Sequence, residues 1–317
     1  MAYIILVAGF LLLVKGADIF VSGSSAIARY FNIPAFIIGL TVVAFGTSMP
    51  EAAISVTAAL KGANGIAVGN ALGSNLFNLL VVLGAFALIR ACPVSRETLR
   101  FEYPLSIIAV MLLLVMSGGF GMGSSSISRI DGIILLALFV IFMIVTVKKA
   151  KKTNDPAGAD EPAGESSMSL VRALIYSLAG IAGIIFGGDL VVDSAVTIAR
   201  DFGIDEILIG LTIVALGTSL PELVISVVAA LKGETDIAVG NVIGSNIFNL
   251  LLVLGLSATI HPIGITILSI YDMIILIAVS LIVLIPLIKN KKLTRGWGVI
   301  MLIIYVAYLA YIIARTM

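Results

Sequence analysis

Long apolar runs alternate with short polar, glycine-rich or proline-rich segments along the whole chain. Each run is about 18 to 25 residues long, which is the length that an α-helix needs to cross a bilayer core of about 30 Å. The pattern predicts an all-α polytopic membrane protein with ten transmembrane helices. The first run has no basic segment before it, so we interpret it as a true span and not as a signal peptide. We expect the helices near residues 2–21, 35–60, 66–89, 102–118, 130–147, 170–192, 206–231, 237–260, 267–288 and 297–314.

The composition excludes a soluble fold. Of the 317 residues, 60% are hydrophobic and 12% are charged, whereas soluble proteins average about 45 to 50% and about 25%. The net charge of +1 provides no basic field for nucleic acid, so we expect no nucleic-acid partner. The single cysteine, Cys92, cannot form an intramolecular disulfide. The lipid bilayer is the expected surrounding, and the sequence indicates no obligate protein partner.

A polar stretch, 148–169, divides the chain into halves of five predicted spans each, 1–147 and 170–317. Its composition is typical of a flexible linker. Cytoplasmic loops carry an excess of Lys and Arg, which favours a cytoplasmic linker and extracytoplasmic termini in a multi-pass cell-membrane protein. Of the 19 Lys and Arg residues, only Lys61, Arg129, Arg200 and Arg315 then face the other side, and Lys15 lies within the first span.

The two halves are copies of one sequence. A shift of 171 residues aligns 38–84 with 209–255, and 34 of these 47 positions are identical. Each half has an odd number of spans, so the second copy enters the membrane from the opposite side. The repeat is therefore expected to be inverted, and folds of this type hold their substrate sites near the bilayer midplane where helices are interrupted.

One repeated motif predicts such interruptions. The sequence Gly-Thr-Ser-x-Pro-Glu occupies 46–51 and 217–222, in the middle of two spans. Pro50 and Pro221 each remove a helical N–H and clash with the carbonyl four residues earlier, so each helix should break or kink there. Polar groups freed at membrane depth are tolerated only where they are buried in protein or line a hydrated cavity.

A carboxylate follows each proline. An ionised Glu at mid-membrane costs about 2.5 to 3.5 kcal/mol on insertion scales, and no Lys or Arg is predicted at the depth of Glu51 and Glu222. A bound cation is the simplest counter-ion. Oxygen ligands suit hard ions such as Ca²⁺, whereas Cys92 and His261 lie outside these segments and give no soft-metal site. The further candidate ligands are the side chains of Asn78, Asn249, Thr47, Ser48, Ser74, Thr218, Ser219 and Ser245 and freed main-chain carbonyls.

The second repeated motif, Gly-Asn-x-x-Gly-Ser-Asn-x-x-Asn, occupies 69–78 and 240–249. Its Ser and final Asn are four residues apart, which places them on one helical face. Two interpretations stay open for its other members. Gly69, Gly73, Gly240 and Gly244 could serve close helix packing, and Asn70, Asn75, Asn241 and Asn246 could serve packing or support the ligands.

The acids outside these motifs carry no assigned transport role. Asp18 and Asp189 are expected to be interfacial anchors or members of helix pairs, with Lys15 three residues from Asp18. Asp272 lies within the ninth predicted span and has no matching acid in the first half.

The doubled motifs on inverted five-span repeats resemble the alpha repeats of the calcium/cation antiporter superfamily, in particular prokaryotic sodium/calcium exchangers. The resemblance implies that Glu51 and Glu222 are the main Ca²⁺ ligands. It implies that the first and sixth spans slide against the other eight helices to switch access. It also implies further Ca²⁺ or Na⁺ ligands in Thr47, Ser48, Ser74, Thr218, Ser219, Ser245, Asn78, Asn249 and the main-chain carbonyls of Ala44 and Ala215.

One position departs from part of that family. Some relatives carry Asp at the position of Asn249, whereas this chain has Asn in both halves. Two ionised Glu side chains balance one Ca²⁺ or two Na⁺ without a further carboxylate. We therefore expect no requirement for K⁺.

The expected function is secondary antiport, in which Na⁺ and Ca²⁺ compete for one pair of carboxylates and no cofactor takes part. Ca²⁺/H⁺ exchange is an alternative, because buried carboxylates can also release a cation by taking up protons. A passive cation channel is another. We do not expect an enzyme, because no Ser/His, Asp/Asp or metal-binding His set appears in the sequence.

Overall fold

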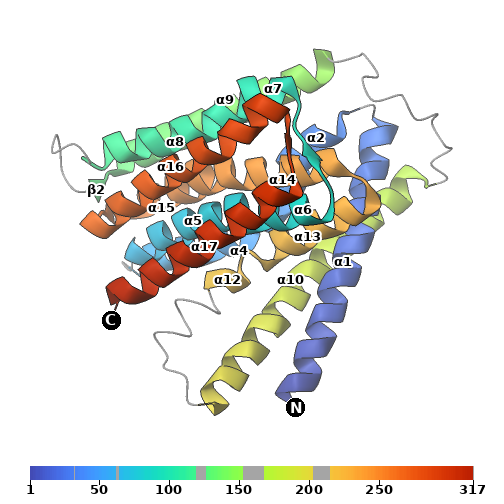
Figure 1. Ribbon diagram of the computed structural model, residues 1–317, viewed down its shortest axis with the longest axis horizontal. Coiled ribbons are helices and arrows are strands. Elements are labelled where there is room, and N and C mark those ends of the chain that lie inside the picture. The colour runs from blue at the N-terminus through green and yellow to red at the C-terminus, as the bar shows by residue number, and fades with distance from the viewer. Residues whose placement is uncertain (32, 62–63, 119–125, 153–167, 203–214, 317) are drawn as a thin grey trace. The chain divides into compact units, whose positions relative to one another are not determined.

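The computed structural model describes residues 1–31, 33–61, 64–118, 126–152, 168–202 and 215–316, which are almost entirely helical (Figure 1). Within these residues, eight helices are long and apolar enough to cross a membrane, and a ninth span results if the broken pair Ala35–Thr47 and Met49–Leu60 is one. They match nine of the ten predicted spans. The remaining predicted span, 206–231, begins outside the described residues. Most of the predicted linker, 148–169, also lies outside them.

The described helices form two compact units, and each unit contains segments from both halves of the sequence. The first unit comprises Met1–Thr47 and Ile141–Asn241. The second unit comprises Ser48–Val140 and Val242–Met317.

Two long antiparallel helices dominate the first unit, α1 (Ala2–Tyr30) and α10 (Leu170–Asp201), which lie side by side (Figure 1). Their backbones touch through small residues spaced seven apart. A Cβ added to Gly16 would lie 2.8 Å from the amide nitrogen of Ile184, and one added to Gly180 would lie 2.6 Å from Cβ of Phe20. Glycine weakens a helix by about 1 kcal/mol relative to alanine, but here it permits the close packing that holds membrane helices together.

The first unit also contains the beginning of one broken span and the described part of the other. The former consists of α2 (Ala35–Ile38), the π-helix η1 (Gly39–Val43) and α3 (Ala44–Thr47), and the latter of α12 (Ala215–Gly217) and α13 (Leu220–Lys232). The unit also includes the larger part of α14 (Thr235–Ile247). An ion pair ties α13 to α1, because Nζ of Lys232 lies 2.8 Å from Oδ1 of Asp18. The same ammonium group donates to Oγ of Ser22 at 2.6 Å. The structure therefore gives Asp18 an ion-pair partner on another helix, Lys232, whereas the sequence suggests Lys15 of the same helix.

The second unit is a bundle around two interrupted helices. One of them runs through α5 (Asn64–Phe77), the π-helix η2 (Asn78–Val82) and α6 (Leu83–Ile89), and the other continues α14 through the π-helix η4 (Phe248–Val253) and α15 (Leu254–Ile260). Among the described spans these two are the most buried. In their most apolar stretches, 72% and 94% of the residues are buried, against 17% in α17. The other helices are α4 (Met49–Leu60), α7 (Arg96–Arg100), α8 (Glu102–Met116), α16 (Ile267–Asn290), α17 (Arg295–Thr316) and the first half of α9 (Arg129–Lys152), whose second half belongs to the first unit.

Short strand pairs in the second unit show the inverted repeat. β1 (Cys92–Pro93) pairs with β4 (Lys292–Leu293), and β2 (Ser126–Ile127) pairs with β3 (Ile263–Gly264), both antiparallel. The 171-residue shift carries Cys92 onto Ile263, so each pair joins one strand from each half of the sequence. Two helix contacts also join one half of the sequence to the other. Gly84 of α6 contacts Gly298 of α17, and its repeat equivalent, Gly255 of α15, contacts Gly132 of α9.

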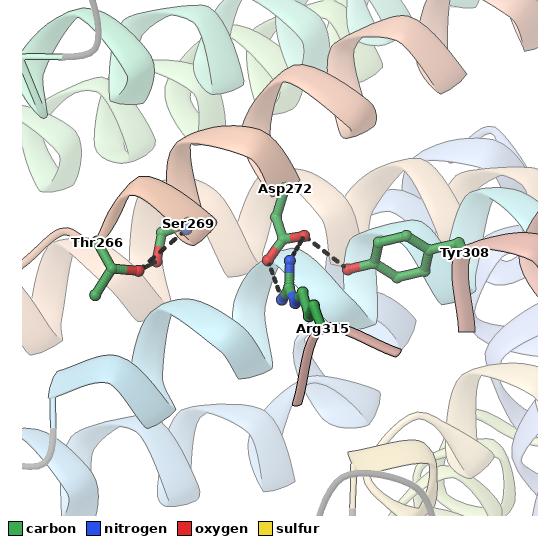
Figure 2. A network of polar contacts seen from close by, with 5 residues as sticks. All are labelled: Thr266, Ser269, Asp272, Tyr308 and Arg315. Carbon is green, nitrogen blue, oxygen red and sulfur yellow. Dashed lines mark hydrogen bonds and ion pairs between the residues drawn. The ribbon is translucent and has the colours of Figure 1, made fainter. Parts of the chain in front are cut away.

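The end of α17 is held against α16 by Asp272, an acid to which the sequence assigned no role (Figure 2). The guanidinium group of Arg315 donates to both carboxylate oxygens of Asp272 at 2.8 Å, and the Tyr308 hydroxyl donates to Oδ1 at 3.4 Å. The same helix α16 begins at a Thr266 cap, whose Oγ1 accepts from the amide of Ser269. Asp272 is thus a structural residue with a bidentate arginine partner.

Candidate cation-binding site

Both predicted helix breaks are present. α3 ends at Thr47 and α4 begins at Met49, while α12 ends at Gly217 and α13 begins at Leu220. The breaks fall just ahead of the prolines, which occupy the first turn of the following helix. Proline is favourable there because its missing N–H is one that a helix start leaves unbonded anyway.

Each break places a carboxylate at a helix N-terminus. Glu51 lies in the first turn of α4 and Glu222 in the first turn of α13, and their exposed fractions are 0% and 1%. A helix N-terminus stabilises a nearby anion by about 0.3 to 1 kcal/mol, and by up to about 2 kcal/mol when partly buried. That is less than the roughly 2.5 to 3.5 kcal/mol cost of the charge at membrane depth, so the helix terminus alone does not offset it.

Helix α5 positions the start of α4. Nδ2 of Asn70 donates to the main-chain carbonyl of Glu51 at 3.2 Å and to Oγ of Ser55 at 3.0 Å. One turn later, Oγ of Ser74 makes a long hydrogen bond of 3.5 Å to Oε1 of Glu51. The structure therefore brings two predicted site residues together, and it gives Asn70 the supporting role that the sequence left open.

A related arrangement occurs in the first unit. Nδ2 of Asn241, the repeat equivalent of Asn70, lies 3.4 Å from Oγ of Ser226, the equivalent of Ser55. Its Oδ1 accepts a hydrogen bond of 3.1 Å from Oγ1 of Thr47, which also lies 3.3 Å from the carbonyl oxygen of Ala44. Thr47 and Ala44, both predicted ligands, thus sit together at the end of α3.

Four buried asparagines meet where α5 passes into η2 and α14 passes into η4. Nδ2 of Asn78 donates to Oδ1 of Asn246, and Nδ2 of Asn249 donates to Oδ1 of Asn75, both at 3.2 Å. Nδ2 of Asn75 donates to the main-chain carbonyl of Asn246 at 3.1 Å. Within the described part of the chain, Oδ1 of Asn78 and Oδ1 of Asn249 are buried and accept no hydrogen bond. Since an unsatisfied buried acceptor costs about 1 to 3 kcal/mol, both oxygens are suited to binding a cation.

Four further predicted ligands are buried at the same breaks and helices. Ser48 separates α3 from α4, Thr218 and Ser219 separate α12 from α13, and Ser245 lies in α14. Ala215, the last predicted ligand, begins α12. Among the residues that the structure describes, no group of three His, Cys, Asp or Glu side chains could hold a metal ion. A cation held here would therefore depend on amide, hydroxyl and carbonyl oxygens beside the carboxylates, which is a ligand set for a hard ion.

One motif glycine serves helix packing. A Cβ on Gly240 would meet the backbone of Phe36 and Leu40. Among the described residues, nothing lies within 4 Å of a Cβ added to Gly69 or Gly73, and positions 207 and 211, the repeat equivalents of Phe36 and Leu40, lie outside the described part of the chain. The packing interpretation is therefore confirmed for Gly240.

The π-helical segments were not predicted. η2 begins at Asn78, and η4 contains Asn249. Segments of this kind often mark functional sites. The residues of η2 and η4 are Leu, Val, Phe and Asn, and nothing in that composition distinguishes a π-helix from an α-helix. The available signal was Asn78 and Asn249 themselves, each the polar residue of its π-helical segment.

Comparison with known proteins agrees with this arrangement. The family model described as "Sodium/calcium exchanger protein" matches residues 1–148 and 172–314, once for each half. Putative antiporter CaxA of Alkalimonas amylolytica is 40% identical over 314 residues, which is 97% of each chain. Sodium/calcium exchanger MaX1 of Methanosarcina acetivorans is 30% identical over 339 residues, again 97% of each chain.

A solved structure gives the same result for the fold. The sodium-calcium exchanger NCX_Mj, soaked with zero Na⁺ and Ca²⁺, matches with a TM-score of 0.84 and 34% identity over 98% of each chain. The matches extend over nearly the whole sequence and include both repeats. The chain belongs to the sodium/calcium exchanger protein family, which is a family of membrane transporters and not of enzymes.

Proposed function

We propose that this protein is a secondary antiporter that exchanges Na⁺ for Ca²⁺ across the cell membrane. The observation that carries the proposal is the pair of buried glutamates, Glu51 and Glu222, each in the first turn of a helix that restarts within a span. The family of the chain supports the same conclusion, because the relative MaX1 is named a sodium/calcium exchanger.

The two glutamates are the principal Ca²⁺ ligands in this proposal. The buried Oδ1 atoms of Asn78 and Asn249, which accept no hydrogen bond from the described residues, complete the ligand set. Hydroxyl and main-chain carbonyl oxygens of both repeats bind Ca²⁺ or Na⁺. The hydroxyl groups are those of Thr47, Ser48, Ser74, Thr218, Ser219 and Ser245, and the carbonyl groups are those of Ala44 and Ala215.

Competition for the carboxylates couples the two fluxes. Ca²⁺ and Na⁺ need the same negative charges, so they cannot be bound together at full affinity. A ligand shifts a conformational equilibrium only by its difference in affinity for the two states. Each ion therefore moves the transporter between states by binding one of them better, and the Na⁺ gradient drives Ca²⁺ out.

Transport is proposed to be independent of K⁺. The amide of Asn249 adds no charge to those of Glu51 and Glu222. Two negative charges match one Ca²⁺ or two Na⁺, and no further carboxylate is left for a K⁺ ion to neutralise.

The proposed topology follows the positive-inside rule. The segment 148–169 is cytoplasmic and both termini are extracytoplasmic. It joins two five-helix repeats, 1–147 and 170–317, which contain the motif regions 38–84 and 209–255. Cysteines introduced in the linker should react with a membrane-impermeant thiol reagent only after the cytoplasmic side has been opened.

The test of the function uses proteoliposomes loaded with Na⁺ and diluted into Na⁺-free medium containing ⁴⁵Ca²⁺. Uptake should require the outward Na⁺ gradient and should be unchanged when K⁺ replaces choline on either side. Uptake that ignores the Na⁺ gradient would exclude Na⁺/Ca²⁺ exchange.

Ca²⁺/H⁺ exchange is the second candidate, and the burial of both glutamates favours it, because a buried carboxylate can release a cation by taking up a proton. The same vesicles distinguish it. An outward H⁺ gradient without Na⁺ would drive uptake by a Ca²⁺/H⁺ antiporter, whereas a passive channel would admit ⁴⁵Ca²⁺ with neither gradient.

A further inference from the structure

We propose that Asn75 and Asn246 are positioning residues that fix the amide groups of Asn78 and Asn249 with their oxygens available to the cation. The inference rests on the proposed function, because it treats Asn78 and Asn249 as ligands. It concerns two residues whose role the sequence left open.

The geometry determines which way each ligand amide faces. Nδ2 of Asn78 donates to Oδ1 of Asn246, and Nδ2 of Asn249 donates to Oδ1 of Asn75. An amide group has one acceptor oxygen and one donor nitrogen. Reversing either ligand amide would bring two acceptor oxygens to the 3.2 Å separation now spanned by a hydrogen bond.

The orientation of Asn75 is in turn set by the backbone. Its Nδ2 donates to the main-chain carbonyl of Asn246 at 3.1 Å. A main-chain carbonyl can only accept, so Asn75 must present its nitrogen to that carbonyl and its oxygen to Asn249. Both polar ends of the Asn75 side chain are therefore used.

Burial makes these constraints strict. The exposed fractions of Asn75, Asn78, Asn246 and Asn249 are between 0% and 3%. With so little exposure, bulk water cannot replace a lost partner, and a buried donor without an acceptor costs about 1 to 3 kcal/mol. The network is accordingly most stable with both Oδ1 atoms of Asn78 and Asn249 left for another ligand.

The same network selects amides over carboxylates at the two ligand positions. A carboxylate at position 249 would place an acceptor against Oδ1 of Asn75, and a carboxylate at position 78 would do so against Oδ1 of Asn246. A carboxylate has no donor when ionised. The asparagine network thus keeps the ionised charge of the site on the glutamates.

The experiment measures Ca²⁺ binding and ⁴⁵Ca²⁺ uptake by the full-length protein in proteoliposomes. Loss of a group that orients a metal ligand typically weakens metal affinity by about 10- to 100-fold. We expect Asn246→Ala and Asn75→Ala each to raise the half-saturating Ca²⁺ concentration by at least about tenfold, with the maximal uptake rate largely retained.

A set of double variants separates positioning from general damage. In an Asn78→Ala background, Asn246→Ala should not raise the half-saturating Ca²⁺ concentration further, because the partner of Asn246 is already absent. In an Asn249→Ala background, the same substitution should raise that concentration by its full factor. Asn75→Ala should behave in the opposite way. If the effects on the half-saturating concentration multiply independently in all four combinations, the positioning role is contradicted, since coupling is expected only between residues that act through each other.

Two controls keep the result interpretable. Tyr103→Phe removes a different buried hydrogen bond of the second unit, from the Tyr103 hydroxyl to the carbonyl of Ser280, and should leave Ca²⁺ half-saturation unchanged. Asn246→Leu keeps the branching of the side chain at Cγ and removes the acceptor, so it shows the loss of the acceptor if the alanine variant does not fold. Wild-type protein that binds no Ca²⁺ would contradict the proposed function, whereas normal Ca²⁺ binding by all positioning variants would contradict only this inference.

Discussion

The side-chain amide of Asn70 donates a hydrogen bond to the main-chain carbonyl of Glu51 at 3.2 Å. The bond joins α5 to the first turn of α4, at the residue that carries the predicted ligand carboxylate. Because Asn70 binds the backbone of Glu51, it fixes the position at which the helix restarts without using the carboxylate oxygens. The position of the Glu51 side chain therefore depends on a residue 19 positions away in the chain.

Replacing Asn70 by alanine should weaken Ca²⁺ transport without abolishing it. The start of α4 would lose its anchor on α5, and we expect the half-saturating Ca²⁺ concentration in ⁴⁵Ca²⁺ uptake to rise by roughly tenfold. Ser55→Ala is the matched control, because it removes the other acceptor of Asn70 and leaves the bond to Glu51 intact. Equal effects of the two substitutions would contradict this explanation.

Replacing either glutamate by glutamine should abolish Ca²⁺ transport while the protein still folds. Glutamine has the same shape but no charge, so Glu51→Gln and Glu222→Gln each halve the charge available to the divalent ion. The measurement is Na⁺-driven ⁴⁵Ca²⁺ uptake, with size-exclusion elution as the check on folding. Glu102→Gln, at a buried acid of α8 outside both motifs, should retain uptake. Normal exchange by either motif variant would remove the basis for the central site.

Replacing Asp272 by asparagine should destabilise the protein and leave Ca²⁺ affinity unchanged. It removes one side of a bidentate pair whose side chains are only 10% and 19% exposed. Hydrogen bonds to charged groups contribute about 1.5 to 3 kcal/mol, and we expect a decrease of that order in the free energy of unfolding. Thermal denaturation in detergent should show a lower Tm.

Arg315→Lys provides the graded comparison for that pair. Lysine keeps the positive charge but cannot form the forked pair of bonds, so its Tm should lie between those of the wild type and Asp272→Asn. A Tm for Asp272→Asn that equals the wild-type value would show that the pair does not hold α17 to α16.

Replacing Gly240 by alanine should destabilise the protein. The added methyl group would meet the backbone of Phe36 and Leu40, and overpacking of this kind costs about 1 to 3 kcal/mol. Thermal denaturation should show a lower Tm. Since alanine favours a helix over glycine by about 1 kcal/mol, an unchanged or raised Tm would show that close packing does not require Gly240.

The helix breaks could be predicted because their cause is local. Pro50 and Pro221 act on the carbonyl four residues earlier, and a carboxylate at membrane depth is conspicuous against an apolar span. The apolar runs gave the number of spans, and the odd number of spans in each copy of the repeat implied the inversion. These features depend on residues adjacent in the sequence or on a simple count.

The partners of Asp272 and Asn246 could not be predicted in the same way. Arg315 lies 43 residues from Asp272, and their meeting depends on how far α17 runs alongside α16. Asn78 lies 168 residues from Asn246, and their bond depends on the axial position and rotation of two helices. A hydropathy pattern gives the length of a helix with an error of several residues, whereas one residue of rotation moves a side chain to another face.

Each compact unit of the described chain takes segments from both halves of the sequence, and each of the two short strand pairs joins one half to the other. A half on its own would therefore leave strand edges and glycine-lined helix faces without their partners. The two halves are copies of one sequence, but neither provides the partners that its own strands and helices need.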